Sequence, residues 1–187
     1  MIVVGGSYTE TVLYPKFATS FVGSGLRAAT ALGEDVDELV TVATTTEEES
    51  VRAAVSGRTT VSVSSRDHPV EFRYLDASLR PQASGLPATP SASLRTDFSG
   101  QDVLAFGMAE FPSGYPLKAE RLVLDPQSPQ IASTTILSGI TASSIAICAN
   151  RAEARRMTGH DSPIEAAAVL LALPNVDAVL VKCGALG

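Results

Sequence analysis

Residues 144–159 read SIAICANRAEARRMTG and predict a buried strand that leads directly into a capped helix. The run Ser144–Ala149 is largely apolar and does not alternate, which is typical of a strand buried on both faces. Asn150 then suits the N-cap of a helix, Glu153 supplies the carboxylate of a capping box, and Gly159 stops the helix. A strand followed at once by a helix indicates an α/β fold.

Three further short apolar runs in the second half of the chain extend this alternation. They predict strands over Val103–Phe106, Arg121–Leu124 and Ala178–Val181. Before the last of these strands, Ser162 followed by Pro163 starts another helix. Continuous apolar strands separated in part by helices predict an α/β fold with a mostly parallel, doubly wound sheet.

The first half of the chain shows the same pattern less regularly. It predicts strands at Ile2–Val4 and Glu38–Ala43 and a helix from Gly25 to Leu32. Thr46 and Glu49 have the spacing of a capping box for a further helix. The run of three glutamates is therefore interpreted as helix-start chemistry rather than as a metal site.

Two segments interrupt the α/β pattern. Residues 59–75 alternate polar and apolar side chains and predict a β-hairpin with one wet face. Residues 81–101 are rich in Pro, Gly and Ser and predict a connection without regular structure. The expected organisation is a single domain over 1–187 with the 59–75 hairpin inserted in it as a small lid. Because hairpins with one apolar face can pair between subunits, a homodimer through this lid is a further expectation.

The composition excludes several classes of protein. Of the 187 residues, 45% are hydrophobic and 18% are charged, and the net charge is −6. This profile is too apolar for disorder, has no run long enough for a transmembrane helix, and carries no basic stripe for nucleic acid. The first residues lack the features of a signal peptide, and Cys148 and Cys183 fit free thiols in a reducing compartment. A cytoplasmic location is therefore expected.

The glycine-rich segment at 23–28 is a candidate ligand contact. It reads GSGLRA and fits the G-x-G-x-x-A pattern of dinucleotide-binding turns. The acidic residue that this pattern needs about 20 residues later is absent, because 43–46 reads ATTT. A plain strand-to-helix turn is favoured, and a small-molecule contact at the glycines is the alternative.

Asn150 and Glu153 also have two interpretations. Local physics favours a helix cap that needs no function. The same residues nevertheless follow a strand, and open α/β sheets bind ligands at the carboxyl ends of their strands. Lys182 follows the last strand with Gly184 close behind it, and a lysine beside glycine suits contact with phosphate.

Taken in chain order, several segments resemble the ribokinase-like (PfkB) family of sugar and nucleoside kinases. Those at 147–154 and 179–187 are close to the family motifs N-x-x-E-A and V-V-T-x-G-x-x-G, and the hairpin at 59–75 lies where the family has a substrate-covering lid. The segments are IVVGGS at 2–7, GSGLRAATALG at 23–33, VLDPQ at 123–127, ICANRAEA at 147–154, MTG at 157–159 and VLVKCGALG at 179–187.

The resemblance implies a chemistry and a set of site residues. It implies transfer of the γ-phosphoryl group of ATP to a hydroxyl of a sugar or nucleoside-like molecule, with ATP and Mg²⁺ as cofactors. It places Asn150 and Glu153 in the Mg²⁺–phosphate network, and Lys182 and Gly184 near the nucleotide. It places the substrate near Glu10, Thr11, Gly23, Ser24, Gly25 and Arg27.

The sequence also departs from the family pattern. Glu10 and Thr11 stand near the family's substrate-binding aspartate, Arg27 near its asparagine, and 44–46 replaces its G-D-D. The D-T-x-G-A-G-D segment, which carries the family's catalytic base, is absent. No catalytic residue is therefore assigned in this chain, and the resemblance implies a domain that is incomplete at its C-terminus, with the base expected beyond residue 187. The chain alone is expected to be inactive. The alternatives are a non-catalytic sugar- or nucleotide-binding module of the same fold and, ranked last, a Rossmann dinucleotide-binding protein.

Overall fold

The structure is a computed structural model that describes residues 1–13, 15–55, 57–75, 81–86, 93–111, 116–127, 137 and 139–184. The chain divides into two compact units, Ile2–Arg95 and Thr96–Gly187, and Met1 groups with the second. Each unit is described by itself. None of the helices in the described ranges is long and apolar enough to cross a lipid bilayer.

Among its described residues, the first unit contains three parallel strands. Strand β4 (Glu38–Ala43) pairs with β1 (Ile2–Val4) on one side and with β5 (Thr60–Ser65) on the other. The apolar side chains of β1 and β4 are buried, which explains their continuous apolar sequence. The helical elements of this unit are α1 (Gly23–Leu32), the 3₁₀ turn η1 (Gly33–Asp35) and α2 (Glu48–Ala54).

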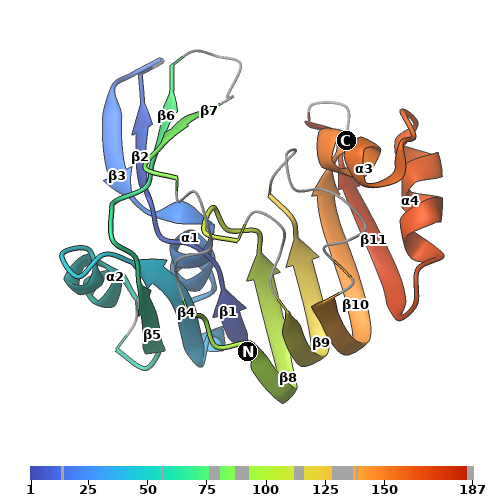
Figure 1. Ribbon diagram of the computed structural model, residues 1–187, viewed down its shortest axis with the longest axis horizontal. Helices are drawn as coiled ribbons and strands as arrows, with labels where there is room; N and C mark the ends of the chain where they lie inside the picture. Colours follow the sequence, from blue (N-terminus) through green and yellow to red (C-terminus); the bar gives the residue numbers. More distant parts are fainter. Residues whose placement is uncertain are drawn as a thin grey trace. The chain divides into compact units, whose positions relative to one another are not determined.

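A second, small sheet in the first unit has the order β3-β2-β6-β7 (Figure 1). Strand β2 is parallel to β6 and antiparallel to β3, and β6 is antiparallel to β7. The strands are short and rich in polar residues, so β2 and β3 carry no strong sequence signal. Their bounds are Thr9–Val12 for β2, Ala18–Phe21 for β3, Glu71–Tyr74 for β6 and Pro81–Ser84 for β7.

The predicted hairpin at 59–75 is wrong in its pairing. Strand β5 joins the parallel sheet beside β4, whereas β6 lies in the small sheet between β2 and β7. Alternation in β5 reflects its place at the end of the strand order, where its side chains are only partly covered. Alternation reports on a strand's faces and does not identify its partner. The expectation of an irregular 81–101 is also wrong, because β7 and the start of the next strand lie there.

The second unit contains four parallel strands in the order β11-β10-β9-β8. All four predicted apolar runs lie within them. Helices α3 and α4 pack against β11, and α3 also contacts β10, while Leu180 of β11 stays 60% exposed. The bounds are Asp97–Phe106 for β8, Leu117–Asp125 for β9, Ile140–Asn150 for β10, Arg151–Thr158 for α3, Pro163–Leu171 for α4 and Val176–Lys182 for β11.

The helix starts in the second unit are as expected. Ser162 accepts a hydrogen bond from the Glu165 N–H at the start of α4, and Pro163 is the first helical residue. Gly159 ends α3 in the left-handed region at φ 79°. The predicted class, an α/β fold with a mostly parallel sheet, is confirmed, and a second small sheet stands in place of the predicted hairpin lid.

Candidate functional site

Three neighbouring strands of the second unit bring charged and polar side chains to one edge. Asn150 at the end of β10 is in register with Lys182 at the end of β11. Lys182 Nζ lies 2.6 Å from Oδ2 of Asp125, the last residue of β9. The ends of β10 and β11 therefore lie side by side. Because parallel strands end at the same edge of a sheet, residues far apart in sequence form one cluster.

The capping box predicted for Asn150 and Glu153 is present. Asn150 Oδ1 accepts a hydrogen bond from the Glu153 N–H at 3.0 Å, and Glu153 Oε2 accepts one from the Asn150 N–H at 2.8 Å. The Glu153 carboxylate is buried. Burial raises its pKa, the Asn150 N–H opposes that rise, and the charge of Asp125 adds to it. One pair of residues thus caps α3 and also places a buried carboxylate within the electrostatic influence of Asp125.

The positive charge of Lys182 offsets part of the negative charge of these two carboxylates. Burial alone would lower its pKa, but the hydrogen bond from its ammonium to Asp125 and the charge of that carboxylate raise it overall. Cys148 lies in the same electrostatic field, and burial raises the pKa of its thiol. A thiol with a raised pKa is a poor nucleophile at neutral pH. Gly184, at φ 64°, follows the cluster with a backbone that favours glycine.

The chemistry of this cluster fits magnesium more than zinc. Within the described parts of the chain, no three His, Cys, Asp or Glu side chains gather closely enough to hold a metal ion. Asp125 and Glu153 still offer two carboxylates, and Asn150 adds an amide oxygen that also accepts the Glu153 N–H. Mg²⁺ prefers oxygen ligands, keeps several waters, and is commonly held through one or two carboxylates and a substrate phosphate.

A second cluster in the first unit joins the small sheet to α1. Arg27 Nη2 of α1 donates to Glu10 Oε2 of β2 at 2.7 Å. Tyr74 of β6 lies close to this pair: burial raises the pKa of its hydroxyl, the charge of Glu10 adds to the rise, and Arg27 opposes it. Glu10 and Arg27, both predicted as substrate contacts, are thus brought together.

Thr11, predicted for the same site, makes different contacts. Its hydroxyl donates to Glu71 Oε1 at 2.9 Å and lies 3.3 Å from the Thr19 hydroxyl. Successive residues of a strand point to opposite faces, so Thr11 and Glu10 lie on opposite faces of the small sheet. The structure does not bring Thr11 to Glu10 and Arg27.

The glycines at 23 and 25 let the start of α1 approach the end of β1. A Cβ on Gly25 would come within 2.8 Å of Gly5 Cα and closer still to the Gly5 carbonyl group. Gly23 adopts φ +69° beside the Gly6 carbonyl. Val22 gives α1 no side-chain cap, and the buried Ser24 hydroxyl has no hydrogen-bond partner among the residues that the structure describes.

The dinucleotide pattern at 23–28 lacks its structural context. In that pattern a parallel strand leads into the glycine turn and the helix. Here α1 follows β3, a strand of the small sheet that pairs antiparallel with β2. The Rossmann alternative therefore loses its main structural support.

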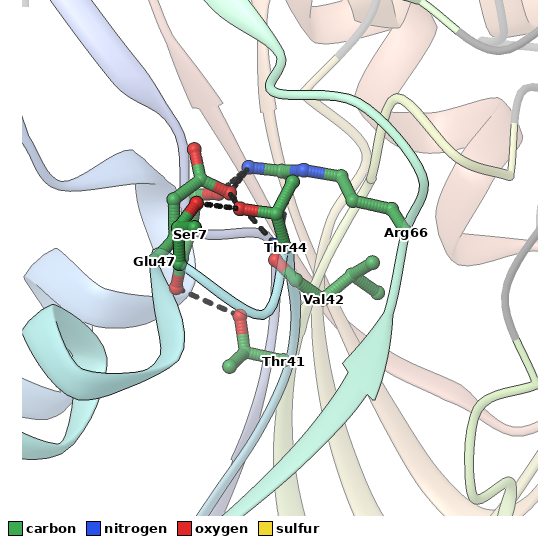
Figure 2. Close-up of polar contacts among 7 residues, drawn as sticks. Ser7, Thr41, Val42, Thr44, Glu47 and Arg66 are labelled. Atoms are coloured by element: carbon green, nitrogen blue, oxygen red, sulfur yellow. Dashed lines mark hydrogen bonds and ion pairs between the residues drawn. The ribbon is translucent and has the colours of Figure 1, made fainter.

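A buried polar network that sequence reasoning missed lies where β1, β4 and β5 end (Figure 2). Arg66 Nη2, just after β5, donates to the Ser7 carbonyl and to Glu47 Oε2, both at 2.8 Å. The Ser7 and Thr41 hydroxyls are 2.8 Å apart. The signal available in the sequence was weak: an arginine that directly follows a strand.

The predicted capping box of Thr46 and Glu49 is wrong. Helix α2 begins at Glu48, and Glu47 before it makes no side-chain cap. Instead, Glu47 Oε2 accepts from the Thr44 N–H at 2.8 Å and from the Thr44 hydroxyl at 2.9 Å. The buried Arg66 draws the carboxylate of Glu47 inward, and a local helix-start pattern contains no information about that distant partner.

The same network reaches the small sheet through aromatic contacts. The Arg66 guanidinium carbon lies 5.2 Å from the ring centroid of Tyr8. The Tyr8 and Phe72 rings pack edge to face with centroids 5.2 Å apart.

A further carboxylate that the sequence did not single out, that of Glu110, is fully buried in the second unit, four residues after β8.

Comparison with known proteins identifies the fold. No model of a protein family matches the sequence, and no characterised protein sequence matches it. Among solved structures, a pyrophosphate-dependent kinase in the ribokinase family, complexed with a pyrophosphate analog and myo-inositol, superposes with a TM-score of 0.62 at 12% identity. That match covers 98% of this chain and 73% of the other.

A fructokinase and a phosphofructokinase superpose on the chain with similar TM-scores. Fructokinase from Vibrio cholerae has a TM-score of 0.56 at 14% identity, and the match covers 100% of this chain and 76% of that one. Phosphofructokinase-2 from Escherichia coli has a TM-score of 0.54 at 12% identity, with 97% and 71% covered. The chain therefore has the fold of the ribokinase-family kinases, as the motif resemblance implied.

Proposed function

We propose that this chain carries the donor and acceptor sites of an ATP-dependent kinase that phosphorylates a hydroxyl of a sugar or nucleoside-like molecule. The observation that carries the proposal is the cluster of Asp125, Asn150, Glu153 and Lys182 at one edge of a parallel sheet. It combines a cation for phosphate oxygens with two carboxylates for a divalent ion. Phosphoryl transfer depends mainly on such positioning and charge neutralisation.

In the donor site, Lys182 binds phosphate oxygens of the donor, and Gly184 lets the backbone pass close to them. Asp125, Asn150 and Glu153 would hold Mg²⁺, which would supply charge neutralisation for the transfer of the phosphoryl group. Glu153 is held in place by its bond to the Asn150 N–H. None of the residues that we assign takes the proton of the acceptor hydroxyl.

In the acceptor site, Glu10 and Arg27 orient the hydroxyl groups of the substrate. A carboxylate accepts hydrogen bonds and a guanidinium donates them, so the pair suits a ligand with several hydroxyls. The Ser24 hydroxyl and the uncapped start of α1 add further polar groups. We also propose that the protein is cytoplasmic and that it has no nucleic-acid partner. The homodimer expected through the 59–75 lid stays a prediction.

Binding of donor and acceptor to the purified chain tests the proposal. We expect Mg²⁺-ATP or Mg²⁺-pyrophosphate to raise the melting temperature of the wild type, and at least one of fructose, ribose, myo-inositol or a nucleoside to do so independently. Lys182→Met is expected to abolish only the donor effect and Arg27→Met only the acceptor effect. Lack of stabilisation by every donor, or equal stabilisation of both variants by all ligands, would contradict the assignment.

Measurement of turnover distinguishes a kinase from a non-catalytic binding module of the same fold. We expect release of ADP or phosphate only when a catalytic base is present, and none of the residues assigned above is that base. Robust ADP release by residues 1–187 would overturn the expectation that these residues are inactive. Binding of a polyol without any effect of donor would instead favour the non-catalytic binding module.

A matched pair of substitutions separates the structural role of Glu153 from its proposed role in the donor site. Glu153→Gln keeps an oxygen acceptor for the Asn150 N–H, so we expect the free energy of unfolding at pH 7 to change by less than about 0.5 kcal/mol. Glu153→Ala removes that acceptor and is expected to lose about 1–2 kcal/mol. Both variants are expected to lose the divalent-ion requirement of donor binding, as isothermal titration calorimetry would show.

The pH dependence of the same variant follows from the raised pKa of Glu153. A carboxyl whose pKa is raised on folding stabilises the fold while it is protonated, and that contribution is lost as pH rises from 4.5 through the raised value. The stability of Glu153→Gln relative to wild type should therefore increase with pH over this window in urea unfolding. A flat difference would mean that the carboxylate ionises in the fold as it does in water.

A further inference from the structure

The ammonium of Lys182 is paired with one carboxylate oxygen of Asp125. Lys182 reaches from the end of β11 past β10 to the end of β9, and its Nζ is 2.6 Å from Asp125 Oδ2. The other oxygen, Oδ1, accepts from the Gln127 N–H at 3.2 Å. Both oxygens of Asp125 therefore have a donor in this structure.

The neighbouring carboxylate adds to the same balance of charge. Glu153 is buried, and the charge of Asp125 raises its pKa whereas that of Lys182 lowers it. Two carboxylates and one ammonium leave one net negative charge at this edge, whereas the pair without the lysine would carry two. A second cation beside the ammonium would be repelled at short range in a partly buried site, where screening is weak.

We propose that Lys182 is a resident counter-cation that keeps the Asp125–Glu153 pair free of divalent ions until a polyphosphate draws its ammonium away. The divalent ion then enters with the donor and not ahead of it. The first part depends only on the observed ion pair. The second part rests on the proposed function, because it requires the donor to bind beside Lys182.

Binding of Mn²⁺, followed by its electron paramagnetic resonance signal, tests this with the full chain. Wild type is expected to bind Mn²⁺ weakly when the ion is added alone and tightly with pyrophosphate or a non-hydrolysable ATP analogue. Lys182→Met is expected to bind Mn²⁺ alone at least about tenfold more tightly than wild type, because one repelling charge is removed. Lys182→Gln should do the same, while Lys118→Met, which removes the exposed partner of Asp97, should not.

Two results would overturn the proposal that Lys182 is a counter-cation. One is equal Mn²⁺ affinity of wild type and both Lys182 variants. The other is a gain in affinity that persists in Lys182→Met/Asp125→Asn, because the gained site must then lie elsewhere. A gain in the Lys182 variants without any effect of polyphosphate on wild type would support the counter-cation and contradict the donor site. Failure of the inference and failure of the proposed function are thus distinguishable.

Discussion

Replacement of Arg66 by methionine is expected to lower the free energy of unfolding by about 3–5 kcal/mol. The Arg66 side chain is 2% exposed and that of Glu47 is 12% exposed. Removing the arginine leaves the Glu47 carboxylate largely buried beside Thr44 without its cation, and it leaves the Ser7 carbonyl without this donor. Urea unfolding followed by circular dichroism measures the change.

The neighbouring pair of Arg52 and Glu48 is a matched control. It also joins an arginine to a glutamate, at 2.7 Å, but its side chains are 52% and 39% exposed. Arg52→Met is therefore expected to lose less than about 1 kcal/mol. Arg66→Met combined with Glu47→Gln should recover part of the loss, since no unpaired charge remains. Similar effects of Arg66→Met and Arg52→Met would contradict the view that burial makes the first pair critical.

Gly25→Ala is expected to have the second large effect, a loss of about 3 kcal/mol. An alanine methyl group would overlap the backbone of Gly5, which no change of side-chain rotamer relieves. The start of α1 must then move away from the end of β1, and with it Ser24 and Arg27. We therefore expect polyol binding to fall together with stability, measured by calorimetry and urea unfolding.

Gly57→Ala provides the control for Gly25→Ala. Apart from its neighbours along the chain, no atom of the described residues would lie within 4 Å of a Cβ on Gly57, and its φ lies outside the left-handed region. The same chemical change there should alter stability by less than about 0.5 kcal/mol. If Gly25→Ala were equally mild and kept polyol binding, the close approach of α1 and β1 would be unnecessary for the acceptor site.

Much of the second unit could be predicted because its signals are local. The runs within β8 to β11 are continuously apolar, and Asn150 and Glu153 cap α3 through bonds between residues close in sequence. The helix starting at Pro163 follows the same logic. Such features depend on neighbours along the chain, so a single sequence contains them.

The partners of weaker strands could not be predicted. Thr60–Ser65 and Glu71–Tyr74 both alternate, but one pairs with β4 and the other with β2 and β7. Thr9–Val12 and Ala18–Phe21 are short and polar, and they become strands through pairing with each other and with β6. Pairing energy comes from residues distant in sequence, which propensity does not report.

Local residue order was therefore sufficient for the α/β class, for the buried strands and for the capped start of α3, because apolar runs and capping bonds act over a few residues. Folding in three dimensions decided which charges meet. Lys182 contacts Asp125 across β10, and Arg66 contacts Glu47 and Ser7 across the ends of three strands. The physical reason is that burial strengthens interactions between charges, so the partners of a buried charge are selected by packing and not by distance along the chain.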